Sequence, residues 1–123
     1  MVASNVEMVE KLLSDLKAIG GVEACAAISR DGLLISAIIQ KEQFADSLAA
    51  MSATILGAAE TATTQLEKGV PNRVIVETDH GILIVVGAGP KALLILQAGP
   101  KAGLGLILLE LEKAARKLKE ILT

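Results

Sequence analysis

The sequence predicts an α+β fold in which a five-stranded antiparallel sheet has helices on both faces. The candidate elements follow in the order helix, strand, strand, helix, strand, strand, strand, helix. The strands are separated by short turns rich in glycine, which indicates hairpins and therefore antiparallel pairing. A long central helix carries apolar residues on two sides. We expect it to cover one face of the sheet and the two terminal helices to cover the other, which gives three layers.

The composition favours one domain, 1–123, with a sizeable apolar core. The chain has 123 residues, of which 52% are hydrophobic. A formal charge of -2 gives no electrostatic basis for binding nucleic acid or an anionic membrane. Phe44 is the single aromatic residue, so a base-stacking surface is not expected.

The sequence also predicts a cytoplasmic protein without a membrane span. The N-terminal residues lack the basic segment and apolar block of a signal peptide. The most apolar stretch, 82–96, is interrupted by glycines, a proline and a lysine, whereas a spanning helix needs about 20 apolar residues in a row. A single cysteine allows no internal disulfide and fits a reducing compartment.

The first helix begins at Ser4 and ends at Gly20-Gly21. Glu7 stands three residues after Ser4, which is the spacing of a capping box. Glycine readily adopts the conformation that ends a helix. Apolar residues recur at helical spacing and predict the buried face: Val6, Val9, Leu12, Leu13, Leu16 and Ile19.

A hairpin follows the first helix. Residues 22–29 form the first predicted strand, Arg30-Asp31-Gly32 the turn, and residues 33–39 the return strand. The return strand is apolar on both faces, which indicates that both faces of the sheet are covered.

The central helix is predicted over 44–66, because this stretch is rich in good helix formers and contains no proline. One apolar stripe at helical spacing contains the larger residues Leu48, Met51, Ile55, Ala59, Ala62 and Leu66. A second, nearly opposite stripe is small and almost uncharged, and contains Ala50, Ala53, Gly57, Thr61 and Thr64, with Glu60 close by. The helix is either an ordinary buried helix of one domain or a helix that packs against a second copy. Gly57 in mid-helix suggests a close approach of another backbone.

Three strands and a helix complete the chain. The strands are predicted over 73–78, 82–86 and 91–97, joined by tight turns. The last helix is predicted to begin near Pro100, because proline suits a first helical turn. Its apolar stripe contains Ile107, Leu108, Leu111, Ala114, Ala115, Leu118 and Leu122.

No group of residues indicates catalysis, a cofactor or a metal site. Cys25 lies between alanines in a predicted strand and is interpreted as a small buried residue. His80 lies in a turn, and one histidine with one cysteine cannot form a zinc site. The pairs Gly87/Gly89 and Gly103/Gly105 fit neither a P-loop nor a dinucleotide fingerprint. Partner binding through a surface is therefore the favoured kind of function.

Several segments, taken in order, resemble the roadblock / dynein light chain family. They are Ile19 to Gly32, Leu48 to Ala53, Arg73 to Glu77 with Gly81 to Val85, and Leu104 to Leu106. Together they extend over nearly the whole chain, and the sequence looks most like single-domain prokaryotic members. The resemblance implies a profilin-like sheet between helices. It also implies a homodimer in which the central helices pack together and the third strands pair.

The resemblance further implies a scaffold or regulator of small Ras-like GTPases without catalytic residues of its own. The alternative is a hetero-oligomeric or peptide-binding scaffold subunit without a GTPase partner. The predicted interface combines the small stripe with the third strand: Ala50, Ala53, Thr54, Gly57, Glu60, Thr61, Thr64, Arg73, Val74, Ile75 and Val76.

Overall fold

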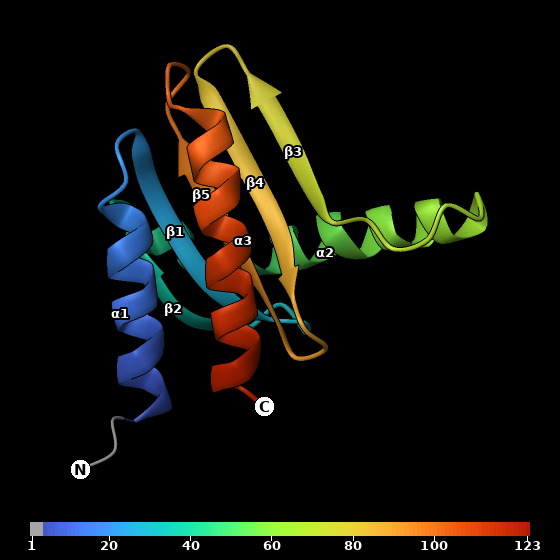
Figure 1. Ribbon diagram of the computed structural model, residues 1–123, viewed down its shortest axis with the longest axis horizontal. Helices are drawn as coiled ribbons and strands as arrows, with labels where there is room; N and C mark the ends of the chain where they lie inside the picture. The colour runs from blue at the N-terminus through green and yellow to red at the C-terminus, as the bar shows by residue number, and fades with distance from the viewer. Residues whose placement is uncertain (1–3) are drawn as a thin grey trace.

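The computed structural model describes residues 4–123, and residues 1–3 of the predicted domain lie outside the described residues. The element order agrees with the prediction (Figure 1). The elements are α1 Asn5–Lys17, β1 Val22–Ser29, β2 Leu34–Ile38, the 3-10 turn η1 Glu42–Phe44, α2 Ala45–Gln65, β3 Arg73–Thr78, β4 Gly81–Ala88, β5 Ala92–Ala98 and α3 Leu104–Ile121.

The five strands of the described residues form one antiparallel sheet in the order β2-β1-β5-β4-β3. β1 pairs with β5, so the N-terminal hairpin joins the C-terminal meander. This arrangement leaves β2 and β3 as the two edges of the sheet. Hairpin pairing could be predicted from the turns, whereas the β1–β5 pairing depends on contacts that are distant in sequence.

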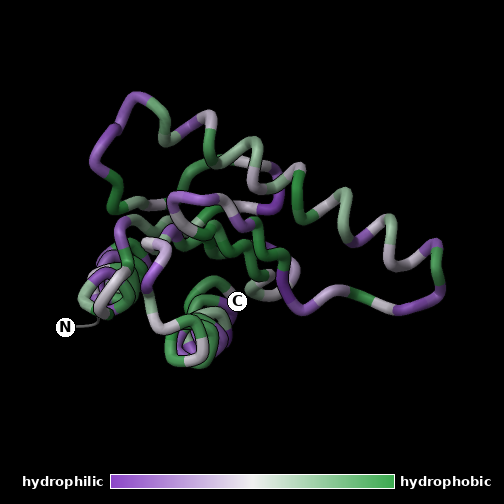
Figure 2. The backbone as a smooth tube through the Cα atoms, turned by 90° about the horizontal axis from the view of Figure 1, so that it is seen from above, coloured by the Kyte–Doolittle hydropathy of each residue, from purple (hydrophilic) through white to green (hydrophobic). Residues whose placement is uncertain are grey.

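Helices cover both faces of the sheet, as predicted. Seen along the sheet, α2 lies on one side and the α1/α3 pair on the other (Figure 2). The larger apolar core lies between the sheet and α1 with α3, around Leu13, Leu94 and Leu111. The smaller core lies between the sheet and α2, around Ile28, Leu56 and Ile95. No helix among residues 4–123 has the length and apolar content needed to cross a membrane.

The first helix begins as predicted. The Ser4 side chain accepts a hydrogen bond from the Glu7 amide at 3.1 Å, and Ser4 is the N-cap residue of α1. Val9, Leu12, Leu13 and Leu16 are buried. Val6, predicted on the buried face, is instead exposed; it lies in the first turn of α1, before the first buried residue of the helix, Val9.

The start of α3 differs from the prediction. Pro100 lies in a turn, and the helix begins four residues later with Gly103 at the N-cap. The Gly99 amide donates to the Gly21 carbonyl at 3.0 Å, and the Ala102 side chain packs on Gly21. These contacts hold residues 99–102 against the residue before β1, and α3 begins after them. The predicted buried stripe of α3 is otherwise confirmed, with Leu108 and Leu122 half-buried.

The buried face of α2 also differs from the prediction. Its buried residues are the small Ala45, Ala49 and Ser52 together with Leu56. The sheet supplies most of the bulk at this contact, so small helix residues can lie closest to it. Of the predicted stripe of larger residues, Leu48, Ile55 and Ala59 are half-buried, whereas the others are exposed: Met51, Ala62 and Leu66. Beyond Leu56 no residue of α2 is buried, because this part of the helix extends past β3 (Figure 1).

Candidate interaction surface

The exposed side of α2 is uncharged over most of its length. We define the outer face of α2 as its exposed, uncharged residues: Ser47, Ala50, Met51, Thr54, Ala58, Thr61, Ala62, Thr64 and Gln65. Met51 exposes 58% of its surface. The Thr54 hydroxyl donates to the Ala50 carbonyl at 2.9 Å, so this hydroxyl is already occupied within the helix. A helix that faces only water is expected to carry charged and polar residues on this side.

The predicted small stripe is only partly on this face. Ala50, Thr54, Thr61 and Thr64 are exposed, as the predicted interface requires. Ala53 is half-buried and packs at the edge of the smaller core.

Gly57 does not meet another backbone within the protein. A side chain built on Gly57 would find no atom within 4 Å. The close approach predicted for this glycine is therefore absent within one copy of the chain, as far as residues 4–123 are concerned. Gly57 is half-buried and lies beside the outer face of α2, so the space next to it is available to another molecule.

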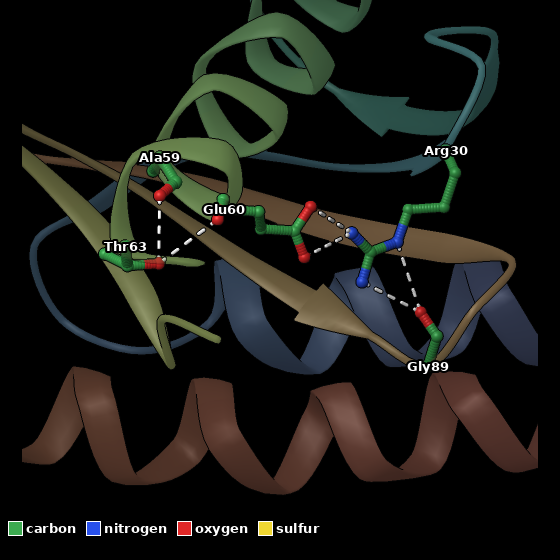
Figure 3. A network of polar contacts seen from close by, with 5 residues as sticks. All are labelled: Arg30, Ala59, Glu60, Thr63 and Gly89. Carbon is green, nitrogen blue, oxygen red and sulfur yellow. Dashed lines mark hydrogen bonds and ion pairs between the residues drawn. The ribbon is translucent and has the colours of Figure 1, made fainter. Parts of the chain in front are cut away.

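Glu60, the charged residue of the predicted interface on α2, binds Arg30 (Figure 3). Arg30 Nη1 lies 3.2 Å from both Glu60 carboxylate oxygens. Arg30 Nε and Nη2 donate to the Gly89 carbonyl at 3.2 and 3.0 Å. The side chains of Arg30 and Glu60 are about 30% exposed. The ion pair thus lies at the margin of the surface and joins the β1–β2 turn, α2 and the β4–β5 turn.

Sequence reasoning missed Arg30. It was assigned to a hairpin turn, where arginine is ordinarily solvated, and no spacing pattern connects it to Glu60 thirty residues later. Glu60 was the available signal. It is the lone acidic residue beside an otherwise uncharged stripe, and a half-buried carboxylate requires a cationic partner.

β3 forms the second part of the predicted surface. Within residues 4–123 it pairs with β4 alone, so one side of its backbone faces outward at the sheet edge. Val74 faces α2 and packs at the edge of the smaller core, whereas Ile75 packs against the larger core on the opposite face. Val76 is 37% exposed and shares the α2 side with Val74. α2 crosses the sheet and contacts β3 among other strands, so the helix lies next to the free edge of the sheet.

Arg73, at the start of β3, lines a cleft of about 230 Å³ between β4 and α3. Arg116 and Lys119 of α3 line the same cleft, together with one carboxylate, Glu112, which lies 3.7 Å from Arg116. The cleft therefore has an excess of positive charge. Arg73 forms no ion pair with any residue in the described part of the chain.

The two reactive side chains lie apart from this surface. Cys25 is buried in β1, where its Sγ donates to the Leu13 carbonyl at 3.3 Å, and burial raises the pKa of its thiol to about 11. His80 is exposed in the β3–β4 turn. Within residues 4–123, no cluster of three or more histidine, cysteine, aspartate or glutamate side chains could hold a metal ion.

An antiparallel sheet between one long helix and a pair of terminal helices, with a free third strand, is the architecture implied by the resemblance noted above. The chain belongs to the Roadblock/LC7 domain family, which its sequence matches over residues 8–98. An uncharacterised protein of Methanocaldococcus jannaschii is 29% identical over 112 residues, which cover 91% of this chain and 97% of that protein.

Solved structures show the same fold. MglB of Myxococcus xanthus superposes with a TM-score of 0.88 at 20% identity, and the match covers 99% of this chain and 92% of MglB. A Roadblock/LC7 domain from Streptomyces avermitilis superposes with a TM-score of 0.85 at 24% identity, and the match covers 91% of this chain and 95% of that domain. The roadblock-type α+β fold predicted from the sequence is confirmed.

Proposed function

We propose that this protein is a non-enzymatic, homodimeric scaffold that acts in the cytoplasm. In this proposal it binds a small Ras-like GTPase and modulates the nucleotide cycle or the localisation of that GTPase. The observation that carries the proposal is the uncharged outer face of α2 together with the free edge of β3, which α2 contacts. A surface of this kind is suited to a protein partner and not to solvent.

A second copy fits this surface because of the way α2 extends past the sheet. The part of α2 after Leu56 holds nine residues, 57–65, and a helix of that length extends about 13 Å. Strands in a sheet lie about 4.8 Å apart. If two β3 strands pair about a two-fold axis, each α2 would reach over two or three strands of the partner subunit. It would there shield the exposed Val76 of the partner subunit, and the two α2 helices would lie side by side.

The GTPase part of the proposal rests on family membership and on the sequence resemblance that implies such a partner. The chain offers no nucleophile, base and metal-ligand combination of its own in the described residues. A regulator of this kind would act by positioning groups of the GTPase. The uncharged outer face of α2 gives no reason to expect a nucleic acid or a lipid headgroup as the partner.

Light scattering tests the homodimer. The expected mass is twice the 12.7 kDa of the chain. Thr54→Lys places a charge in the middle of the outer face of α2 and should give a monomer. Ser14→Lys adds the same charge to an exposed position of α1 and should remain dimeric. A wild-type mass of one chain at micromolar concentration would contradict the homodimer.

The GTPase is tested by mixing the dimer with small Ras-like GTPases from the same genome, loaded with GDP or with a non-hydrolysable GTP analogue. Complex formation in one nucleotide state, and a changed rate of hydrolysis or exchange, are the expected results. A stable dimer that binds none of them in either state would remove the GTPase and favour the hetero-oligomeric or peptide-binding scaffold.

A further inference from the structure

The free edge of β3 has a sequence that is complementary to itself when read in the opposite direction. Arg73 and Glu77 enclose the apolar residues Val74, Ile75 and Val76. Side chains alternate along a strand, so Arg73, Ile75 and Glu77 lie on one face and Val74 and Val76 on the other. The positions of Val74 in the smaller core and Ile75 against the larger core agree with this alternation.

Symmetry limits how two such strands can pair. In an antiparallel pair, residues directly opposite each other have side chains on the same face of the sheet. A two-fold axis perpendicular to the sheet keeps each face on its own side. A residue can therefore lie opposite only a residue of the partner strand whose number is the same as its own or differs from it by an even number. The two-fold axis must then pass next to one residue and not between two neighbouring residues.

We infer that the two-fold axis passes at Ile75, so that Arg73 lies opposite Glu77 of the partner subunit; this inference rests on the proposed homodimer. Val74 then lies opposite Val76 of the partner subunit, and Ile75 opposite Ile75 of the partner subunit. Each interface contains two Arg–Glu pairs, one at either end of the paired segment. Every residue from 73 to 77 thereby meets a residue of matching chemistry.

The charges of one copy support this register. Neither Arg73 nor Glu77 forms an ion pair within residues 4–123. Arg73 lines the cleft that also contains Arg116 and Lys119 and only one carboxylate. An incoming Glu77 of the partner subunit would supply a second carboxylate at the mouth of this positively charged cleft.

The neighbouring registers match less well. An axis at Val74 would put Arg73 opposite Ile75 of the partner subunit and Glu77 opposite Pro71 of the partner subunit, beyond the strand. An axis at Val76 would put Ile75 opposite Glu77 of the partner subunit, which pairs an apolar side chain with a carboxylate. Only the axis at Ile75 pairs each charge with its opposite inside the strand.

Cysteine cross-linking tests the register directly. In a Cys25→Ala background, Ile75→Cys should form an intermolecular disulfide under mild oxidation. Opposite residues of an antiparallel pair have Cα atoms about 4.5–5.5 Å apart, which suits a disulfide. Val74→Cys and Val76→Cys, each alone, should not cross-link, whereas the two mixed in equal amounts should. Self-cross-linking of Val74→Cys or Val76→Cys in place of Ile75→Cys would overturn the inference.

Charge reversal gives an independent test. Arg73→Glu and Glu77→Arg should each weaken the dimer by roughly tenfold or more, since like charges would then face each other at both ends. The double variant R73E/E77R should restore the wild-type dissociation constant. Lys101→Glu, with the same change in net charge as Arg73→Glu on an exposed turn before α3, should have no effect. Additive losses in the double variant would overturn the inference.

These outcomes separate the register from the homodimer itself. If the wild-type protein has the mass of one chain, the homodimer fails, and cross-linking is not needed to show it. If it has the mass of two chains but Ile75→Cys does not cross-link, the homodimer stands and the register is wrong. Circular dichroism of each variant confirms that the protein remains folded.

Discussion

At the scale of single residues, Arg30 joins three parts of the chain that are distant in sequence. Its guanidinium holds the Glu60 carboxylate and the Gly89 carbonyl at the same time, with distances of 3.0 to 3.2 Å. A side-chain carbon on Gly87 would lie 2.7 Å from Arg30 Nη2, so glycine leaves room for the guanidinium to pass over β4. Because Arg30 presents several donors in a fixed plane, it can join three elements where lysine could not.

Replacing Arg30 with alanine should destabilise the fold. The loss of hydrogen bonds to a charged group and of a partly exposed ion pair should lower the free energy of unfolding by about 1–2 kcal/mol. Chemical denaturation at fixed protein concentration measures this. Lys113→Ala removes an exposed ion pair with Glu110 on α3 and should change stability by less than about 0.5 kcal/mol. Equal effects of the two substitutions would show that the Arg30 contacts contribute no more than an ordinary surface pair.

Cys25 gives a pH-dependent prediction. Burial raises the pKa of its thiol from 9.0 to about 11. The folded state thus disfavours the thiolate, and the associated stability is present below pH 9 and is lost as the pH rises towards 11. Thiol reagents should react with the native protein far more slowly than with the unfolded chain at pH 8, because the thiolate is the reactive form. Rapid labelling of the native protein at pH 8 would contradict a buried Cys25.

At the scale of elements, the two halves of α2 differ in how far they are buried. Its first half is anchored by small residues and Leu56 on the sheet, and its second half is buried nowhere. Helical periodicity predicted the helix and its ends to within a residue or two, because Pro71 and Gly69 mark where it must stop. Periodicity could not predict which stripe faces the sheet, since that depends on how much bulk the strands supply from the other side.

In the strands, too, some features follow from the local sequence and others from contacts between residues that are distant in sequence. The bounds of β1 and β3 agree with the prediction residue for residue, because turn residues define both ends of each strand. The pairing of third strands that the resemblance implies requires β3 to lie at an edge of the sheet. That position follows from the β1–β5 pairing, which no local pattern encodes. The Arg30–Glu60 pair was likewise missed, since both residues come together only when α2 has crossed the sheet.

Gly57 supports a prediction that separates folding from association. Gly57→Ala should stabilise one copy by roughly 0.5–1 kcal/mol, because alanine is the better helix former and a side chain there meets no atom within 4 Å. Gly57→Leu should also fold, but the larger side chain should interfere with a helix of a second copy. Sedimentation should then find Gly57→Ala dimeric and Gly57→Leu shifted to the monomer. A Gly57→Leu protein that is still fully dimeric would show that Gly57 lies outside the interface.

At the scale of the whole molecule, the two faces of the sheet are covered unequally. Two helices cover the α1/α3 face with the larger core, whereas α2 alone crosses the other face and then leaves it. Exposed apolar side chains remain on the less covered side at Met51, Leu66 and Val76. A second copy related by a two-fold axis at β3 would cover this side with its own α2, so dimerisation would complete the layer that one chain leaves unfinished.

If the protein is a homodimer, its thermal stability should depend on protein concentration. If a second α2 completes the layer, the folded dimer is favoured by mass action and the unfolding midpoint should rise by a few degrees, roughly 2–5 °C, for each tenfold increase in concentration. Ser14→Lys should keep that dependence. Thr54→Lys should lose it and melt at a lower, constant temperature, since its exposed α2 face would stay in water. Calorimetry over a hundredfold range of concentration measures the slope. A wild-type midpoint that does not move over this range would mean that one chain is stable with its outer α2 face in water, and the incomplete layer would then have no role in association.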